Sequence, residues 1–326
     1  PDDTTFDGDS KLDDGSATEG TGDADNNGTP NFLDDDNDGD GVVDGDEDKN
    51  GDGILDSGET DPNDADTDGD GINDGIETSN DDGTNPGQAI DTDGEGGIDA
   101  RENDSDGDGI NDSVEDLTPD DGVATDTDGD GTPDFRDEDS DGDGIPDTIE
   151  GTDDPDGDVT PNFQDTDSDD DGILDKNEDV NGDGLLDDSE TDPYDADTDG
   201  DGIDDNTEGA ESNTDTDGDG TIDAQDSDSD GDGIDDSIEG NGNADGDGTA
   251  NYRDTDADGD GILDENEDVN GDGSLDNDET DPYDADTDGD ALSDSLEDAG
   301  SNTDTDGDGT IDARGDDSDD DGLSDS

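Results

Sequence analysis

The stretch DTDGDGINDGIE at residues 66–77 decides the fold of this chain. Related copies lie at 139–150 and 179–190, and their general form is Asp-x-Asp-x-Asp-Gly-apolar-x-Asp-x-x-Glu. We name each copy by its first residue and number its positions from 1 to 12. Twenty such loops start at residues 23, 36, 48, 66, 91, 104, 126, 139, 154, 167, 179, 197, 215, 228, 243, 256, 268, 286, 304 and 317. Position 6 is glycine in eighteen of them, so the register is too regular for low complexity alone.

This spacing matches the way a short loop surrounds a calcium ion. Calcium takes six to eight hard oxygen ligands, and carboxylates at positions 1, 3 and 5 converge when the chain curls around the ion. Glycine at position 6 permits the sharp turn, the carbonyl of residue 7 is the next ligand, and an acid at position 12 closes the far side. Position 9, for example Asp74, holds a bridging water or reaches a neighbouring ion. Magnesium competes less well because it prefers a rigid octahedron.

The predicted ligands follow from these positions, and we expect about twenty or more calcium ions. The side-chain ligands at positions 1, 3, 5 and 12 are Asp23, Asp25, Asn27, Asp34, Asp36, Asp38, Asp40, Glu47, Asp48, Asn50, Asp52, Glu59, Asp66, Asp68, Asp70, Glu77, Asp91, Asp93, Glu95, Glu102, Asp104, Asp106, Asp108, Glu115, Asp126, Asp128, Asp130, Asp137, Asp139, Asp141, Asp143, Glu150, Asp154, Asp156, Asp158, Asp165, Asp167, Asp169, Asp171, Glu178, Asp179, Asn181, Asp183, Glu190, Asp197, Asp199, Asp201, Glu208, Asp215, Asp217, Asp219, Asp226, Asp228, Asp230, Asp232, Glu239, Asn243, Asp245, Asp247, Asp254, Asp256, Asp258, Asp260, Glu267, Asp268, Asn270, Asp272, Glu279, Asp286, Asp288, Asp290, Glu297, Asp304, Asp306, Asp308, Asp317, Asp319 and Asp321. The carbonyl ligands at position 7 are those of Thr29, Val42, Ile54, Ile72, Ile110, Thr132, Ile145, Thr160, Ile173, Leu185, Ile203, Thr221, Ile234, Thr249, Ile262, Ser274, Leu292, Thr310 and Leu323.

The composition excludes several classes of protein. The 326 residues carry 122 acidic and 7 basic side chains, a formal net charge of −115. Only 17% of residues are hydrophobic, so the chain cannot build a conventional core, and composition alone favours a disordered acidic polymer. We expect no nucleic-acid partner and no membrane insertion, because there is no basic patch and no long apolar run. We also expect no enzymatic activity, because histidine and cysteine are absent and no apolar pocket would tune a carboxylate pair.

The loops stand too close together for EF-hands, which need a helix on either side. The loop ending at Glu47 is followed at once by the loop starting at Asp48, and most gaps hold zero to six residues. The predicted fold is therefore mostly irregular, with little regular secondary structure. It is a calcium-stabilised rod of tandem EF-hand-like loops without helices, in which isolated apolar residues at positions 7 and 11 plug the space between loops.

In abutting copies, Asp-x-Asp-x-Asp-Gly-x-x-Asp-x-x-Asp/Glu resembles thrombospondin type 3 repeats. The cysteine-free form, with DTDGDGI alternating with ETDPxDADTDGDG, resembles repeats of bacterial surface and secreted proteins, particularly those of Bacteroidota. The resemblance covers about residues 23–326. It implies an extended, calcium-stabilised region with little regular secondary structure, located outside the cell or on its surface.

A longer period groups the loops into blocks. Loop starts from 154 to 228 recur 89 residues later, from 243 to 317. We divide the chain into a degenerate leading repeat (1–22), a six-loop block (23–125), an inserted loop pair (126–153), a second six-loop block (154–242) and a third, truncated one (243–326). Because the last loop stops before its closing acid, we expect a segment of a longer protein or a subunit completed by its neighbour.

A few other residues stand out from the acidic background. Aromatic residues gather at position 10 (Phe32, Phe135, Phe163, Tyr252) and after Glu-Thr-Asp-Pro (Tyr194, Tyr283); they seal joints between loops, or the two tyrosines form an exposed contact site. The cations Lys49, Arg136, Lys176, Arg253 and Arg314 offset local repulsion. Covalent glycans are a further hypothesis, at Asn27 and Asn111 or at the position-10 hydroxyls of Ser113, Thr148, Ser237 and Ser295.

Four functions remain open from the sequence. The leading one is a rigid calcium-dependent stalk or spacer of a bacterial surface protein. The alternatives are a subunit of an extracellular fibre assembled end to end from copies of this chain, an adhesive or glycan-binding module, and an Asp-rich calcium-buffering or mineral-binding polymer.

Overall fold

The computed structural model describes residues 22–80, 83–116, 123–276, 278–297, 303–307 and 309–315. Within these ranges the chain has single helical turns joined by irregular segments, and no β-strand. No helix there is long and apolar enough to cross a membrane. The prediction of a mostly irregular fold is confirmed. The leading repeat at 1–21 and the loop starting at 317 lie outside the described residues.

The loops fall into three types that follow a simple order. In every second loop, which we call type A, positions 9–12 form a four-residue α-helical turn: α1 (Asp44–Glu47), α2 (Asp74–Glu77), α3 (Asp112–Glu115), α4 (Asp147–Glu150), α5 (Asp175–Glu178), α6 (Asp205–Glu208), α7 (Asp236–Glu239) and α8 (Asp264–Glu267). The ninth type A loop, loop 286, has the 3-10 turn η9 (Asp294–Leu296) in the same place. Flanking helices were excluded by the sequence, but the loops themselves are not free of helix.

The intervening loops are of type B or type C. In type B, positions 9–11 form a 3-10 turn: η1 (Asn31–Leu33), η2 (Asp99–Arg101), η4 (Asp134–Arg136), η5 (Asn162–Gln164), η7 (Asp223–Gln225), η8 (Asn251–Arg253) and η11 (Asp312–Arg314). Type C, which comprises loops 48, 179 and 268, has no helical turn among its described residues. One further 3-10 turn, η6 (Ala210–Ser212), lies between loops 197 and 215.

Hydrogen bonds from position 2 fix the side chain of position 9, the first residue of the turn. In loop 66 the Asp74 carboxylate accepts hydrogen bonds from the Thr67 amide at 2.8 Å and the Thr67 hydroxyl at 2.6 Å, which pins position 9 over position 2. Asp112 and Ser105 repeat this pair in loop 104. A helix this short is stable only through such contacts.

Most type A and type B loops bury one or two apolar residues rather than sharing a continuous core, whereas the apolar residues of type C loops, such as Ile54 and Leu185, are exposed. Position 7 of type A loops is almost inaccessible, with Ile72 and Ile145 both 0% exposed. Position 11 is more open than expected from the sequence, since Val114 is 40% exposed. The aromatic residues at position 10 of type B loops are buried, including Phe135, Phe163 and Tyr252. Their predicted role at the joints between loops fits this burial.

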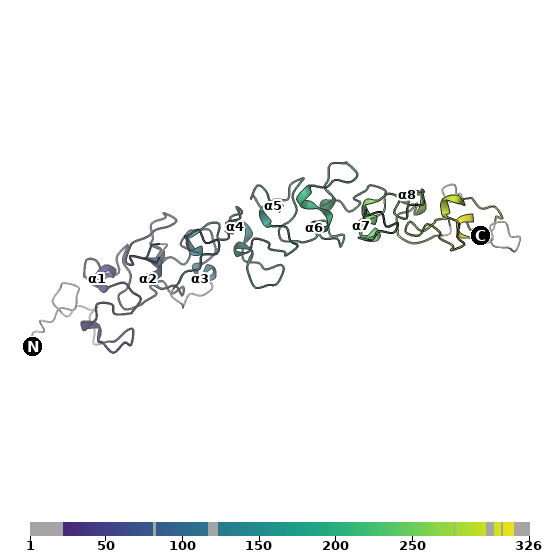
Figure 1. Cartoon of the computed structure of the whole chain (residues 1–326). Helices are drawn as coiled ribbons and strands as arrows, with labels where there is room; N and C mark the ends of the chain where they lie inside the picture. Colours follow the sequence, from purple (N-terminus) through teal and green to yellow (C-terminus); the bar gives the residue numbers. More distant parts are fainter. Residues whose placement is uncertain are drawn as a thin grey trace, which may run out of the picture. The chain divides into compact units, whose positions relative to one another are not determined.

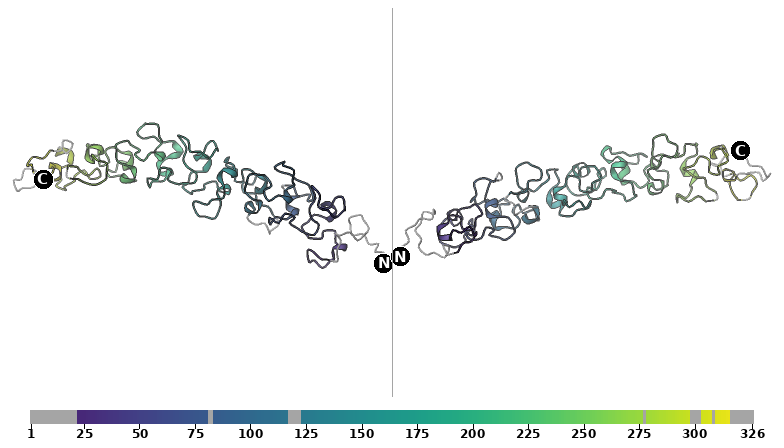
Figure 2. Two further views of the ribbon diagram at one scale, coloured as in Figure 1. Left: turned by 180° about the vertical axis from the view of Figure 1, so that it is seen from behind. Right: turned by 60° about the horizontal axis from the view of Figure 1, so that its bottom comes forward.

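The chain divides into two compact units. Unit 1 is Pro1–Thr166 with Gly182–Gly184, and unit 2 is Asp167–Asn181 with Leu185–Ser326. In unit 1 the turns α1 to α4 follow one another in the order of the sequence (Figure 1), and the same holds for α5 to α8 in unit 2 (Figure 2). The boundary between the units lies inside the block predicted at 154–242, so contact units and sequence blocks are different divisions of the chain.

Candidate metal sites

Each type A loop curls around a point toward which its carboxylates converge. In loop 66, Asp66 accepts hydrogen bonds from the Gly69 and Gly71 amides at 2.8 and 3.1 Å. Asp68 accepts one from the Asp70 amide, and Asp70 accepts one from the Ile72 amide. Side-chain oxygens of Asp66, Asp68 and Asp70 consequently lie within 4.8 Å of one another. In Asp68 and Asp70 the amide occupies Oδ1 and leaves Oδ2 for another partner, whereas both oxygens of Asp66 accept an amide.

Several carboxylate oxygens of loop 66 are buried and have no hydrogen-bond partner. This applies to Oδ2 of Asp68, Oδ2 of Asp70 and both carboxylate oxygens of Glu77, whose side chain is 1% exposed. Glu115, Glu208 and Glu239 repeat the pattern with both oxygens. Burying one polar group without a partner costs about 1–3 kcal/mol, and more if it is charged. Such a pocket calls for a cation.

The electrostatics agree with this description. Burial, followed by the carboxylates of Asp68 and Asp70, raises the pKa of Glu77 to about 11. For Glu115, burial and the carboxylates of its own loop raise the pKa to about 11 in the same way. The pKa of Asp68 rises to about 7, again first through burial and then through Asp70. Without a counter-ion these sites therefore hold protons at neutral pH.

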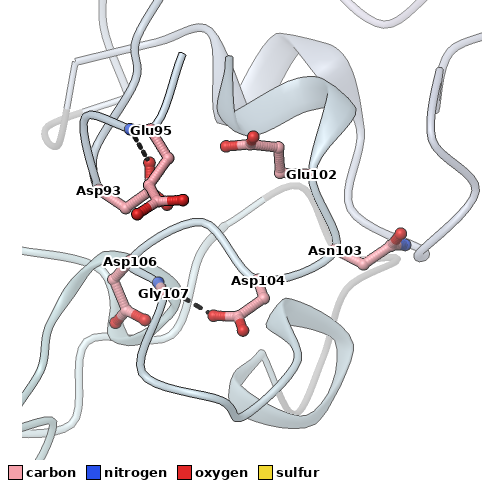
Figure 3. Close-up of a pocket in the computed structure, with 7 residues that line it drawn as sticks. All are labelled: Asp93, Glu95, Glu102, Asn103, Asp104, Asp106 and Gly107. Carbon is pink, nitrogen blue, oxygen red and sulfur yellow. Dashed lines mark hydrogen bonds between the residues drawn. The ribbon is translucent and has the colours of Figure 1, made fainter. Parts of the chain in front are cut away.

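The predicted carboxylate ligands of type B loops are more exposed to solvent than those of type A loops. In loop 91, Asp93, Glu95 and Glu102 line an open pocket of about 540 Å³ together with Asp104 and Asp106 of the next loop. Figure 3 shows these side chains around one space, contributed by two consecutive loops. In four other type B loops, the exposed position-5 carboxylates accept hydrogen bonds from the threonine at position 7, which lowers their pKa values; these are Asp130, Asp158, Asp219 and Asp247. Type B sites are thus more solvated than type A sites.

In two type C loops the predicted ligand at position 3 contacts the aspartate at position 9, which the predicted set did not include. Asn50 at position 3 donates from its amide to Asp56 at 2.9 Å, and Asn181 donates to Asp187 at 3.2 Å. In the type B loop 23, Asn27 donates similarly to Asp34 at 2.9 Å. These amide contacts must be exchanged before an ion enters.

The structure places most of the predicted ligands around their loops. Asp308 and the four predicted ligands of loop 317 (Asp317, Asp319, Asp321 and Leu323) lie outside the described residues. The predicted set omitted two groups. The first is the Ser or Thr at position 2, which holds position 9. The second is the threonine of Glu-Thr-Asp-Pro, since Thr60, Thr191 and Thr280 donate to Glu47, Glu178 and Glu267 of the preceding type A loops.

Position 11 of type B loops has a role that the sequence did not reveal. Arg136 is buried, pairs with the Asp99 carboxylate at 2.6 Å and donates to the carbonyls of Glu77 and Ser79. Gln164 occupies the equivalent place and donates to Asp134 at 2.7 Å and to the Glu115 carbonyl at 2.9 Å. These side chains therefore join a type B loop to the end of an earlier type A turn, beyond the general charge offset expected for the arginines.

The two tyrosines after Glu-Thr-Asp-Pro are less accessible than a binding platform requires. Tyr194 and Tyr283 are only partly exposed, and their hydroxyl oxygens are buried. Burial, followed by Glu239 and Asp264, holds the pKa of Tyr283 well above its usual range. This partial burial favours the hypothesis that the two tyrosines seal joints between loops over that of an exposed contact site.

No protein-family model matches the chain, and no curated protein matches it.

Proposed function

We propose that this chain is an extracellular, calcium-binding structural region that acts as a rigid stalk or spacer of a surface protein. One observation carries the proposal: at position 12 of type A loops, both carboxylate oxygens of Glu77, Glu115, Glu208 and Glu239 are buried and have no hydrogen-bond partner. Together with the carboxylates at positions 1, 3 and 5 and the carbonyl at position 7, they supply about the six hard oxygens that calcium requires. The flexible mixture of carboxylates and carbonyls favours calcium over magnesium.

The same arrangement supplies the mechanism of stiffening. Without metal, mutual repulsion among 122 acidic side chains expands the chain. Each bound ion gathers one twelve-residue loop, so the free energy of metal binding becomes free energy of folding. Extracellular calcium modules have dissociation constants of about 10⁻⁴–10⁻³ M, which suits a region that folds on leaving the cell.

A calcium titration of the metal-free chain, followed by small-angle scattering and native mass spectrometry, tests the proposal. We expect a cooperative transition to a stiff, extended particle at millimolar calcium, with about twenty bound ions. Magnesium at the same concentration should leave most loops unfolded. A chain that stays a random coil at millimolar calcium would refute the proposal.

A matched pair of variants tests the site itself. Glu267 and Glu265 lie on the same turn, α8, but Glu267 is buried with one unpartnered oxygen whereas Glu265 is exposed. We expect Glu267→Gln to lose one calcium ion at subsaturating calcium and Glu265→Gln to lose none. Equal ion counts in the two variants would contradict the assignment.

Electron microscopy separates the stalk from the fibre. Particles of one chain length at all protein concentrations indicate a stalk, and longer filaments with calcium indicate a self-assembling fibre.

A further inference from the structure

Three type A loops dock on the preceding type A loop through the residue at position 10. In unit 2, the Asn206 amide N–H donates to Asp171 at 3.0 Å and its side chain donates to the Asp171 carbonyl at 3.1 Å. Ser295 makes the same two bonds to Asp260, at 2.7 and 2.8 Å. In unit 1, Gly75 lies so close to Asp40 that an added Cβ would be 2.1 Å from the Asp40 carbonyl oxygen. One contact, between position 10 and position 5, thus recurs along both units.

This docking carries the neighbouring position-9 carboxylate into the metal pocket. Carboxylate oxygens of Asp40, Glu47 and Asp74 lie within 4.8 Å of one another, and Asp74 belongs to the next type A loop. The same is true of Asp70 and Glu77 with Asp112. Asp74 and Asp112 are both 0% exposed. The two Glu77 oxygens that face this point are buried and have no hydrogen-bond partner, which marks it as a place for a ligand rather than a chance acidic cluster.

The carboxylate of Asp112, which comes from the next type A loop, can still bind an ion. Each carboxylate oxygen of Asp112 accepts one hydrogen bond from Ser105, at 2.7 Å in both cases. A carboxylate oxygen has two lone pairs, so one remains on each atom. The Ser105 bonds hold the carboxylate in place, as partners of metal ligands commonly do.

We propose that, within each unit, the position-9 aspartate of a type A loop is a ligand of the ion in the preceding type A loop of that unit, so that these sites are composite and coupled. The inference rests on the proposed calcium binding and adds to it the ligands that join one site to the next. Asp74 completes the site of loop 36, and Asp112 completes the site of loop 66. An ion in loop 104 orders α3 and thereby presents Asp112 to loop 66. Calcium binding is therefore positively cooperative along each unit, and the coupling between two neighbouring sites is reciprocal.

Hydrogen exchange read by mass spectrometry tests this one loop at a time in the full chain. The measured quantity is the calcium concentration at which amides of residues 66–77 become half protected. We expect Asp112→Asn to raise this concentration on the order of tenfold, because calcium affinity depends on the number of charged ligands. Asp112→Glu keeps the charge on a longer arm, so its shift should be smaller.

Ser105→Ala is the matched control, because it removes a hydrogen bond within loop 104 but leaves the Asp112 carboxylate. The chain tolerates this change elsewhere, since position 2 of loop 256 is Ala257 and its amide still donates to Asp264. We expect Ser105→Ala to shift loop 66 less than about twofold. An unchanged midpoint in Asp112→Asn, or equal shifts in Asp112→Asn and Ser105→Ala, would overturn the composite site while leaving calcium binding intact. A wild-type chain without calcium-dependent protection in any loop would refute the proposed function itself.

Discussion

Arg136 offers a quantitative test of how a type B loop is held to the rest of unit 1. Its side chain is 3% exposed, and its partner Asp99 is fully buried, with 2.6 Å between Nε and Oδ2. It also donates to the carbonyls of Glu77 and Ser79, and its guanidinium lies 4.9 Å from the Phe135 ring centroid. The Arg136→Met variant removes the charge and all its hydrogen bonds while keeping an apolar side chain.

The expected magnitude follows from the burial of this pair. Removing one partner of a buried ion pair costs about 3–5 kcal/mol, because the other charge remains buried without compensation. Arg136→Gln is the matched variant, because Gln164 makes the corresponding two bonds in loop 154. It should lose only about 1–2 kcal/mol, the worth of one or two hydrogen bonds to buried groups.

The assay is hydrogen exchange of the calcium-saturated chain, read on peptides covering 91–102 and 126–137. A loss of about 3–5 kcal/mol in the free energy of local opening corresponds to roughly 150- to 5,000-fold faster exchange in Arg136→Met. A loss of about 1–2 kcal/mol corresponds to roughly 5- to 30-fold faster exchange in Arg136→Gln. Peptides from unit 2 serve as the internal control. Losses of equal size in the two variants would refute the claim that the hydrogen bonds, which glutamine can replace and methionine cannot, help to hold the loop.

Three further predictions use local features. Val159 lies at position 6 with φ of 94° and is 84% exposed. Val159→Gly should relieve about 1 kcal/mol of left-handed backbone strain and lower the calcium concentration at the midpoint of loop 154 several-fold. An unchanged midpoint would argue against strain at this residue. Gly75→Ala should weaken the contact with Asp40, which would appear as faster hydrogen exchange in residues 36–47. Unaltered hydrogen exchange would mean that the backbone at Asp40 accommodates the added methyl group. The pKa of Glu77 is raised to about 11, so the metal-free folded loop binds more protons than the unfolded chain above about pH 4.5, and its stability falls as pH rises. Acidification from pH 7 to 4.5 should therefore compact the metal-free chain but weaken calcium binding, because ligands must be deprotonated; scattering that expands in the metal-free chain on acidification would contradict this sign.

Much of the site was predictable because it is local. Asp66, Asp68, Asp70 and Glu77 lie within one loop of twelve residues, and the turn that brings them together needs only the glycine at position 6, Gly71, with φ of +113°. The prediction that apolar residues at position 7 plug the space between loops agrees with the burial of Ile72 and Ile145 in type A loops, but not with Ile54 and Leu185 of type C loops, which are exposed. The helical turn at positions 9–12 was missed, because four residues leave no helical periodicity to detect.

By itself, the sequence determined the register of the loops, the oxygen ligands that each one carries and the lack of a conventional core. These properties depend on residues at most eleven positions apart. The tertiary structure alone decided which loops touch: the Asn206–Asp171 contact spans 35 residues and the Arg136–Asp99 pair spans 37. Such partners cannot be read from a repeating sequence, because every loop offers the same aspartates and only packing selects the pair that meets.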